Sequence, residues 1–564
     1  MISKLKKIIK SMNIDGYIIP KNDMFFSEYS NPDRLAFLTK FTGSAGIAIV
    51  TLNKNFLFID GRYKVQAQNE CGKKFKILQI PFETPKSVLA KFKNKLSLGY
   101  DPNLFTSKNL VNIFGDKHKL IPLENLIDKF FVNKNSSKIK SYYGLDHSIT
   151  GETVKSKVSK IVRILKKKKI DNIFISAPEN VAWLLNIRGY DNPNSPIPNC
   201  RIILNKDKTI FFFSDLKKIK KIKNTLKHTN IKYYEFEDFL NILSILNGKN
   251  FIIDEKSCSI FNESIISSRF IIKDRIDPCY YLKSIKNKTE IKNMKEAHIV
   301  DGVALTKFIY LFKNNKRKLT EIATEKILEN LRKKNKNYLY PSFNTIAGSG
   351  PNSSIIHYRS NNKTNRIINK KDIFLIDSGG QYKYGTTDVT RTLCMRSPNK
   401  EIKNIYTRVL KGHIAVARSN LKIYKTGDQI DKNARKPLKK INLDYPHGTG
   451  HGVGYFLNVH EGPQAISKYN KITLKKGMIL SNEPGFYKRN KFGIRIENLI
   501  YIDENKKGLF FRNLTYAPID KDLINYKILN KMEKNYLFRY HLEVYNLLSK
   551  YLNNDERKWL AKLI

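Results

Sequence analysis

Five residues between positions 377 and 497 are of types that bind metal ions, and each lies in a short strand-like or glycine-rich string. They are Asp377 in FLIDSGG, Asp388 in GTTDVTRT, His451 in HGTGHGVG, Glu483 in NEPGFY and Glu497 in GIRIEN. Carboxylates that lie close together repel one another unless a cation sits between them. The pattern therefore predicts a site for two metal ions, and it indicates metal-assisted hydrolysis as the reaction class.

The two aspartates are expected to meet through a hairpin. IFLIDSG has the pattern of a short apolar strand that ends at Asp377, and VTRTLCM has that of a second strand that begins just after Asp388. The string GGQYKYGTT between them is rich in turn residues. Either aspartate alone is more simply interpreted as a surface turn residue. A hairpin that carries both is what favours a joint site.

The histidines lie in the string HGTGHGVGYFLNVHEG, whose glycines exclude a stable helix. In an extended chain His447 and His451 point to the same face, because side chains four residues apart do so. His460 follows in the same string. A single histidine is usually structural, but three within fourteen residues favour a functional role.

The two glutamates follow strand-like segments. Glu483 follows the apolar string MILSN and precedes a Pro-Gly turn that would end the strand. In FGIRIEN, strand alternation places Ile494 and Ile496 on one side. Arg495 and Glu497 then lie on the other side. A buried glutamate beside an arginine can also be a structural ion pair, but the order of the five strings favours a site.

The length of 564 residues suggests three or four domains, and 41% hydrophobic residues are enough to form their cores. The five cysteines are odd in number and form no CxxC pair, which argues against a disulfide framework and fits a reducing compartment. The amino terminus lacks a signal-peptide pattern, and no stretch has the roughly 18 apolar residues needed to span a bilayer. We therefore expect a soluble, cytoplasmic protein with no membrane partner.

The formal net charge is +53, from 103 Lys and Arg against 50 Asp and Glu. Such a balance raises nucleic acid or an anionic membrane as a partner. The lysines are spread over the whole chain rather than gathered in one segment. We interpret the charge as a compositional bias, and we expect no specific nucleic acid partner.

The first two-thirds of the chain contain an internal repeat. The string IDGYIIPKNDMFF is echoed by IDNIFISAPENVAW, RLAFLTKFTG by NVAWLLNIRG, and FLFID by IFFFSD, in the same order. Each copy alternates short strands with helical patterns, which predicts two α/β domains of one type. Coincidence is the alternative, because short apolar strings recur easily.

A long amphipathic helix is predicted after lysine-rich connections near 131–141 and 283–288. In KNKTEIKNMKEAHIVDGVALTKFIYLF the apolar residues fall on or near one face. The catalytic strings follow on mostly β segments. A tail over 509–564, rich in Tyr, Leu and Phe, ends in a helical pattern and is expected to pack on the preceding domain.

Together these strings resemble the Xaa-Pro aminopeptidase (aminopeptidase P) family. It belongs to the pita-bread metallopeptidases, with prolidase, creatinase and methionine aminopeptidase. The resemblance spans nearly the whole chain, including YIIPKNDMFFSEY, FIDGRY, NSSIIHY, GTTDVTRT, HGTGHGVGYFLNVHEGP, NEPGFY and FGIRIEN. It implies an α/β and α+β multidomain protein of the three-domain cytosolic type. The expected parts are creatinase-like domains at 1–135 and 136–284, a pita-bread catalytic domain at 285–508, and a C-terminal tail at 509–564.

The resemblance also assigns roles to the metal ligands. Asp377 would bind one metal, Asp388 and Glu497 would bridge both, and His451 with Glu483 would complete the second site. Two divalent ions are implied. Mn²⁺ suits a carboxylate-rich set with one imidazole, and Zn²⁺, Co²⁺ and Fe²⁺ are the alternatives. Asn482 and Phe486 depart from the residues usual in the family, whereas Glu483 and Tyr487 are kept.

The expected reaction is hydrolysis of the bond between an N-terminal residue and a following proline, with a hydroxide held between the metals as nucleophile. Glu483 would move the proton, and His357 and His460 would stabilise the tetrahedral oxyanion. By resemblance the residues of the proline pocket are His357, His447, His460, Tyr487 and Arg495. The family implies peptide substrates with proline in second position and a homodimer.

Two other functions fit parts of the pattern. A dipeptidase of the same group (prolidase) would cleave only Xaa-Pro dipeptides, and the three-domain length argues against it. A non-catalytic pita-bread module that binds nucleic acid or protein is supported by the charge alone. The complete set of ligands argues against that module.

Overall fold

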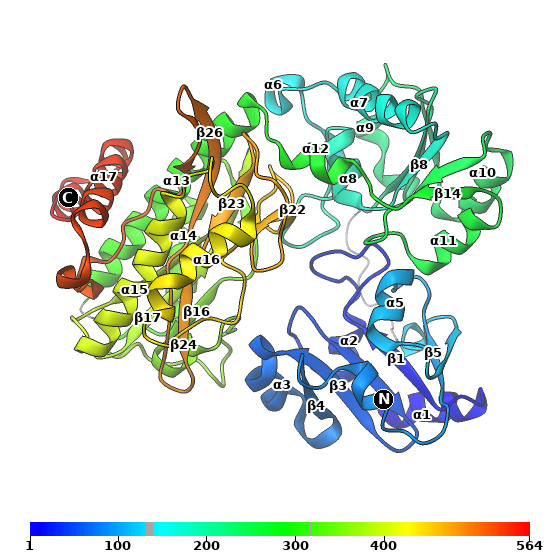
Figure 1. Cartoon of the computed structure of the whole chain (residues 1–564), viewed down its shortest axis with the longest axis horizontal. Helices are drawn as coiled ribbons and strands as arrows, with labels where there is room; N and C mark the ends of the chain where they lie inside the picture. Colours follow the sequence, from blue (N-terminus) through cyan, green and yellow to red (C-terminus); the bar gives the residue numbers. More distant parts are fainter. Residues whose placement is uncertain (131–138, 316) are drawn as a thin grey trace. The chain divides into compact units, whose positions relative to one another are not determined.

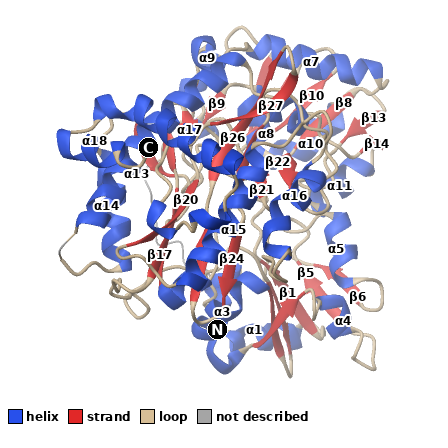
Figure 2. Ribbon diagram, turned by 60° about the vertical axis from the view of Figure 1, so that its left-hand side comes forward, coloured by secondary structure: helices blue, strands red, loops and turns tan. Residues whose placement is uncertain are grey.

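The computed structural model describes residues 1–130, 139–315 and 317–564. Within these ranges the chain divides into two compact units. The first is Met1–His147, Glu152–Pro193 and Ile197–Cys279, and the second is Ser148–Gly151, Asn194–Pro196 and Tyr280–Ile564. Figures 1 and 2 show the elements of both units. The expected boundary between residues 135 and 136 lies outside the described residues.

In the described part of the chain, no helix combines the length and the apolar character needed to cross a membrane.

The first unit begins with a six-stranded mixed sheet in the order β4-β3-β2-β1-β5-β6. Its strands are β1 (Gly16–Pro20), β2 (Ile47–Thr51), β3 (Asn55–Asp60), β4 (Lys76–Ile80), β5 (Ser97–Tyr100) and β6 (Lys119–Pro122). Its helices are α1 (Ile2–Ser11), α2 (Arg34–Thr39), α3 (Lys64–Cys71), α4 (Pro85–Leu89) and α5 (Ser107–Phe114). Helix α1 buries Leu5 and Ile9 in the core.

A second six-stranded sheet in the same unit has the order β12-β11-β10-β8-β13-β14. Its strands are β8 (Asn172–Ile175), β10 (Arg201–Asn205), β11 (Ile210–Phe213), β12 (Ile231–Tyr234), β13 (Asn250–Ile252) and β14 (Ile271–Asp274). Its helices are α7 (Val154–Lys167), α8 (Pro178–Leu184), α9 (Lys220–Thr225), α10 (Phe239–Ile245) and α11 (Ile260–Ser267). A two-stranded sheet pairs β7 (Tyr143–Gly144) with β9 (Ile187–Arg188).

The predicted repeat is present in the topology. When β1 is matched with β8, both sheets have the same strand order and the same directions: two antiparallel pairs and three parallel ones. The three pairs of echoed strings fall on β1 and β8, on α2 and α8, and on β3 and β11. Both copies belong to one compact unit.

The second unit carries two pairs of packed helices, α13 with α14 and α15 with α16. Two short helices belong to this unit only in part: α6 (His147–Thr150) from Ser148 onward and α12 (Cys279–Ser284) from Tyr280 onward. The other helices are α13 (Lys288–Asn314), α14 (Glu321–Lys333), α15 (Lys400–Ala417), α16 (Gly427–Lys439), α17 (Lys531–Leu548) and α18 (Asn554–Ala561). The predicted long helix is α13. It buries Met294, Ala297, Leu305 and Ile309. An Asn287–Glu290 capping box fixes its start.

Four antiparallel sheets complete this unit. Two have three strands: β15 (Tyr338–Pro341), β18 (Gly380–Tyr382) and β19 (Gly385–Thr386) in one, and β16 (Ile346–Ser349), β17 (Ile373–Ser378) and β20 (Val389–Cys394) in the other. The largest has the order β22-β21-β23-β26-β27, with β21 (Gly450–Gly452), β22 (Glu461–Ile466), β23 (Ile479–Asn482), β26 (Asn498–Asn505) and β27 (Gly508–Asn513). The last pairs β24 (Gly485–Lys488) with β25 (Phe492–Arg495).

The C-terminal tail shares a hydrophobic core with the rest of the second unit, as predicted. Leu537, Val544 and Leu548 of α17 are buried with Val409 and Leu410 of α15. Burial of one leucine or valine side chain contributes about 1.5–3 kcal/mol to stability. The tail is therefore an integral part of this unit.

Candidate metal centre

Three carboxylates meet at β17, at the start of β20 and at the segment between β25 and β26. Strands β17 and β20 are antiparallel, with Asp377 opposite Thr390, and Asp388 lies just before β20. The expected hairpin is thus formed. Each of Asp377, Asp388 and Glu497 offers an oxygen within 4.8 Å of the others. All three are buried.

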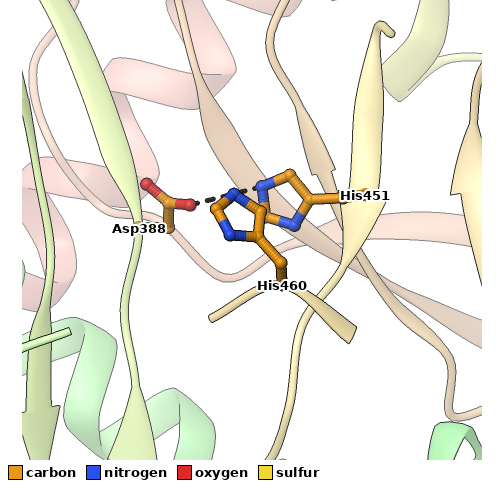
Figure 3. Close-up of side chains that lie close together, drawn as sticks. All are labelled: Asp388, His451 and His460. Atoms are coloured by element: carbon orange, nitrogen blue, oxygen red, sulfur yellow. Dashed lines mark ion pairs between the residues drawn. The ribbon is translucent and has the colours of Figure 1, made fainter. Parts of the chain in front are cut away.

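His451 approaches this group from β21. Its Nε2 lies 3.4 Å from Asp388 Oδ2 and 3.4 Å from Glu483 Oε1. Figure 3 shows the Asp388 carboxylate directed at the His451 ring, with His460 beside it. The close packing of β21 on β23 requires a glycine at position 450, because a Cβ there would lie 1.9 Å from Ser481 O. The residue before His451 must therefore be glycine for β21 to pack this closely on β23.

The tautomer of His451 is fixed by its own strand. Nδ1 lies 2.9 Å from Gly452 O, and because a carbonyl only accepts, Nδ1 must be the donor. In the neutral ring Nε2 is then a lone-pair acceptor directed at Asp388 and Glu483. Histidines that bind metals commonly donate their other N–H to a backbone carbonyl in this way.

Two hydroxyl residues that the motifs did not single out hold the ligands in place. Thr390 Oγ1 donates to Glu497 Oε2 at 2.8 Å, and Ser481 Oγ donates to Glu483 Oε1 at 2.8 Å. Ser481 Oγ also accepts from His451 N at 2.9 Å. Thr390 lies two residues after Asp388, and Ser481 lies two residues before Glu483. Because side chains two residues apart in an extended chain share a face, strand alternation predicts that each hydroxyl lies on the side of a ligand.

Burial and neighbouring charges shift the pKa values of three residues in this cluster. Burial, together with Asp388 and Glu483, raises the pKa of Glu497 well above its usual range. Burial raises the pKa of Asp377 to about 6, although Arg495 acts in the opposite direction. Burial lowers the pKa of His451, but contacts with Asp388 and Glu483 outweigh it and raise that pKa to about 9.

These residues fit divalent cations. Asp377 Oδ1 is buried and has no hydrogen-bond partner among the described residues. His451, Glu483 and Glu497 form a second group of three whose ligand atoms lie within 4.8 Å, and this group shares Glu497 with the three carboxylates. Two overlapping ligand groups are what a pair of bridged ions requires, and cations between the carboxylates would remove their repulsion.

A chain of hydrogen bonds leads from the carboxylates to His447. Arg495 Nη2 donates to Asp377 Oδ2 at 2.6 Å, and Arg495 Nη1 donates to Tyr487 OH at 2.7 Å. Tyr487 OH lies 3.0 Å from His447 Nε2. Because His447 Nδ1 donates to Gly448 O at 2.8 Å, Nε2 of the neutral ring accepts from the tyrosine.

The extended chain expected from His447 to His451 is wrong in part. The backbone bends at 446–447 and 449, and β21 begins only at Gly450. Arg435 of α16 holds the bend through hydrogen bonds to Tyr445 O at 2.8 Å and His447 O at 2.6 Å. His447 therefore contacts Tyr487, whereas His451 contacts the carboxylates.

His460 and its neighbour mark another side of the site. The rings of His451 and His460 are 4.2 Å apart between centroids, and His460 is exposed. The next residue, Glu461, is buried and forms ion pairs with two buried lysines, Lys283 at 3.3 Å and Lys286. These pairs fix the chain immediately after His460.

His357 lies in the turn that follows the short 3-10 helix η6 (Gly350–Ser354). This helix is held against β25, the strand of Arg495, by a hydrogen bond from Gly493 N to Ser353 Oγ at 2.7 Å. A Cβ at Gly493 would lie 1.9 Å from Ser353 O, so only glycine allows this approach. His357 is half-buried and belongs to the segment next to the Arg495 strand.

A further group of ligand-type residues, Cys394, Asp520 and Asp522, is occupied by a side chain. Lys313 Nζ lies 2.6 Å from Asp520 Oδ2 and 2.9 Å from Asp522 Oδ2. The lysine supplies the positive charge there, so we assign no metal to this group.

Comparison with protein families divides the chain into four matched regions. Residues 1–130 and 133–290 match the creatinase/prolidase N-terminal domain. Residues 292–504 match metallopeptidase family M24, and residues 507–563 match the C-terminal region of peptidase M24.

Individual relatives agree with this division. A probable Xaa-Pro aminopeptidase P of Laccaria bicolor is 36% identical over 596 residues, which cover 100% of this chain and 92% of the relative. The crystal structure of X-prolyl aminopeptidase from Caenorhabditis elegans, described as a cytosolic enzyme with a di-nuclear active site, is 30% identical. It matches with a TM-score of 0.92 over 100% of this chain and 98% of its own. Prolidase from Pyrococcus furiosus is 27% identical, with a TM-score of 0.51, and covers 63% of this chain. The chain therefore belongs to the Xaa-Pro aminopeptidase P family, within metallopeptidase family M24.

Proposed function

We propose that this protein is a metal-dependent aminopeptidase that hydrolyses the peptide bond between an N-terminal residue and a proline in second position. The observation that carries the proposal is the cluster of five ligand-type side chains in a chain that matches an X-prolyl aminopeptidase over its whole length. The relatives that match over the whole chain are Xaa-Pro aminopeptidases, which favours the aminopeptidase over the dipeptidase.

The ligands proposed for two divalent ions are Asp377, Asp388, His451, Glu483 and Glu497. When bound, the ions supply a nucleophile at neutral pH and polarise the scissile carbonyl. A carboxylate-rich set with one imidazole favours Mn²⁺. The fixed tautomer of His451 and the unpartnered oxygen of Asp377 support this assignment.

Glu483 is the proposed proton carrier. It would accept a proton from the attacking water and deliver it to the proline nitrogen as the peptide bond breaks. Ser481 Oγ donates to Glu483 Oε1 at 2.8 Å and so fixes the orientation of the carboxylate. His460 and His357 would donate hydrogen bonds to the oxygen that becomes negative in the tetrahedral intermediate.

Recognition of the substrate would involve both its ends. The free N-terminal amine is a cation and would bind beside Asp377, which limits attack to the first peptide bond. Proline has no N–H, so its site must use ring packing rather than backbone hydrogen bonds. The half-buried rings of His447 and Tyr487, 5.5 Å apart between centroids, together with Arg495, are the proposed walls.

The remaining assignments are proposals as well. We place the domain boundaries at 135/136, 284/285 and 508/509, and the family matches that end at 130, 290 and 504 support this division. A cytoplasmic location is supported by the structural neighbour, which is described as a cytosolic enzyme, and by five buried cysteines that form no CxxC pair. A homodimer is supported by the exposed Met532, Phe538 and Leu542 on α17, and sedimentation analysis tests it.

The decisive experiment uses the full-length protein after treatment with a chelator. Addition of Mn²⁺ should restore release of arginine from Arg-Pro-Pro, and Arg-Ala-Pro should remain intact. Cleavage of the dipeptide Arg-Pro without cleavage of Arg-Pro-Pro would establish a dipeptidase instead. Failure of every divalent ion to restore either cleavage would exclude a metallopeptidase.

A further inference from the structure

Arg391 is fully buried, and its five N–H groups lie within hydrogen-bond distance of six oxygens. It lies on β20, three residues after Asp388. Strand alternation directs Thr390 and Thr392 to the side of Glu497 and Arg495, where Thr390 Oγ1 donates to Glu497 Oε2 and Thr392 Oγ1 donates to Arg495 O. The guanidinium of Arg391 points the other way.

The six acceptors of Arg391 are all neutral oxygens. Nε donates to Pro518 O at 2.9 Å, and Nη1 donates to Thr390 O at 2.8 Å and Glu497 O at 2.6 Å. The two hydrogens of Nη2 are shared among Asn498 Oδ1 at 2.8 Å, Ala517 O at 2.8 Å and Tyr540 OH at 3.0 Å. A planar guanidinium with all its nitrogens engaged has one orientation, so it fixes the segments that it joins.

Glu497 needs such support because of its place in the chain. It lies between β25 and β26, which belong to different sheets, so no strand ladder fixes its backbone. Its N–H donates to Thr390 O at 3.1 Å, and its carbonyl accepts from Arg391 Nη1. The next residue, Asn498, also accepts from Arg391 through its side chain.

Half of the acceptors come from the C-terminal tail. Ala517 and Pro518 contribute carbonyls, and Tyr540 of α17 contributes its hydroxyl. Tyr540 OH in turn donates to Ala517 O at 2.8 Å. Tyr540 thus fixes both the guanidinium and one of the carbonyls that receive it.

We propose that Arg391 and Tyr540 are positioning residues through which the C-terminal tail holds Glu497 in the orientation that the metal pair requires. Neither residue is among the proposed metal ligands or the proposed walls of the proline pocket. Their effect passes through the backbone of Glu497 and the side chain of Asn498. The proposal rests on the proposed function, because it assumes that Glu497 bridges two ions.

The test is a titration of metal-free, full-length protein with Mn²⁺. Tyr540→Phe removes one hydroxyl and keeps the ring. Residues that orient metal ligands typically change metal affinity by about 10- to 100-fold when replaced. We expect Tyr540→Phe to weaken Mn²⁺ binding by about 10-fold and Arg391→Lys to weaken it further. Excess Mn²⁺ should restore the turnover of Tyr540→Phe.

Tyr536→Phe is the matched control. Tyr536 lies one turn earlier on α17, stacks on Tyr540 with centroids 6.5 Å apart, and has its hydroxyl 3.4 Å from Asn513 Nδ2. It should bind Mn²⁺ as the wild type does. The proposal is overturned if Tyr540→Phe and Tyr536→Phe have the same Mn²⁺ affinity. The proposal is also overturned if Tyr540→Phe lowers the melting temperature of the metal-free protein but leaves its Mn²⁺ affinity unchanged.

Different results would contradict the metallopeptidase function and the positioning role. If the wild type takes up no Mn²⁺ or other divalent ion, the metallopeptidase function itself is wrong. If the wild type binds two ions and Tyr540→Phe binds them equally well, only the positioning role is wrong. Should Arg391→Lys fail to fold, Tyr540→Phe alone carries the test.

Discussion

Arg495 binds one oxygen of Asp377, at 2.6 Å from Oδ2, and the other oxygen of that carboxylate has no hydrogen-bond partner among the described residues. The arginine thereby orients Asp377 and leaves Oδ1 available. The same guanidinium donates to Tyr487 OH and to Thr390 Oγ1. One side chain thus links a proposed ligand to the proposed proline pocket.

Replacement of Arg495 by lysine should lower kcat/KM for Arg-Pro-Pro by about 10- to 100-fold. Lysine keeps the charge, but it cannot reach three differently placed acceptors with one planar group. Steady-state kinetics at saturating Mn²⁺ provides the measurement. Arg512→Lys, at an exposed ion pair with Asp503, is the matched control and should retain wild-type activity. Equal activity of the two variants would contradict the role of Arg495.

Glu483→Gln should lower kcat by about 10²- to 10⁴-fold, because glutamine cannot accept the proton that must pass to the proline nitrogen. The circular dichroism spectrum should be unchanged. Turnover of Arg-Pro-Pro under metal-saturated conditions gives the value. A variant with near-normal kcat would show that another group carries the proton.

Glu497→Gln should separate metal binding from stability. Burial and the neighbouring carboxylates raise the pKa of Glu497, so a neutral amide at this position costs the metal-free protein little. In chelator we expect a melting temperature at least equal to that of the wild type. Added Mn²⁺ should raise the melting temperature of the wild type, because the ions bind only the folded state, and should not raise that of the variant.

The control for this experiment is Glu504→Gln, an exposed residue at the other end of β26. Its response to Mn²⁺ should equal that of the wild type. A strong fall in the melting temperature of metal-free Glu497→Gln would contradict the prediction, since it would mean that the charge itself stabilises the fold.

Stability should fall as the pH falls below about 6.5, in part because of His541. Burial, together with Lys521, lowers the pKa of this histidine to about 3, and its Nε2 accepts from Ile519 N at 3.1 Å. The unfolded chain, with an ordinary histidine pKa near 6.5, therefore binds one proton more than the folded protein between these two pH values. The free energy of unfolding should fall by about 1.4 kcal/mol per pH unit from this residue.

Urea unfolding at pH 7.5, 6.0 and 5.0 measures this slope. His541→Gln should have a smaller slope than the wild type by about that amount. His228→Gln, at an exposed histidine, should keep the wild-type slope. An unchanged slope in His541→Gln would show that other groups cause the loss of stability.

Local patterns predicted the parts of the site that local structure determines. The hairpin of Asp377 and Asp388 follows from two apolar strands and a turn-rich string. Glu497 lies just beyond the end of β25, but Arg495 and Glu497 both contact Thr390 Oγ1 and so lie on one side, as the expected alternation of side chains indicated. Neither prediction requires knowledge of distant residues. The internal repeat was visible for the same reason, since its landmarks are strands and helices that form from adjacent residues.

Long-range contacts determine what the sequence could not reveal. The bend that separates His447 from His451 depends on Arg435 of a preceding helix. The role of Arg391 depends on carbonyls and a hydroxyl more than 100 residues away, which no spacing rule connects. The positions of Thr390 and Ser481 could be predicted in part. Strand alternation gives the side to which each hydroxyl points, but not the carboxylate that accepts its hydrogen bond.

The two matching sheets of the first unit have an evolutionary consequence. Identical strand order and direction in consecutive stretches of one chain are the outcome expected from duplication of an ancestral segment. None of the five proposed metal ligands comes from either copy, so chemistry placed no shared constraint on their side chains. Selection could therefore act separately on the two copies after the duplication.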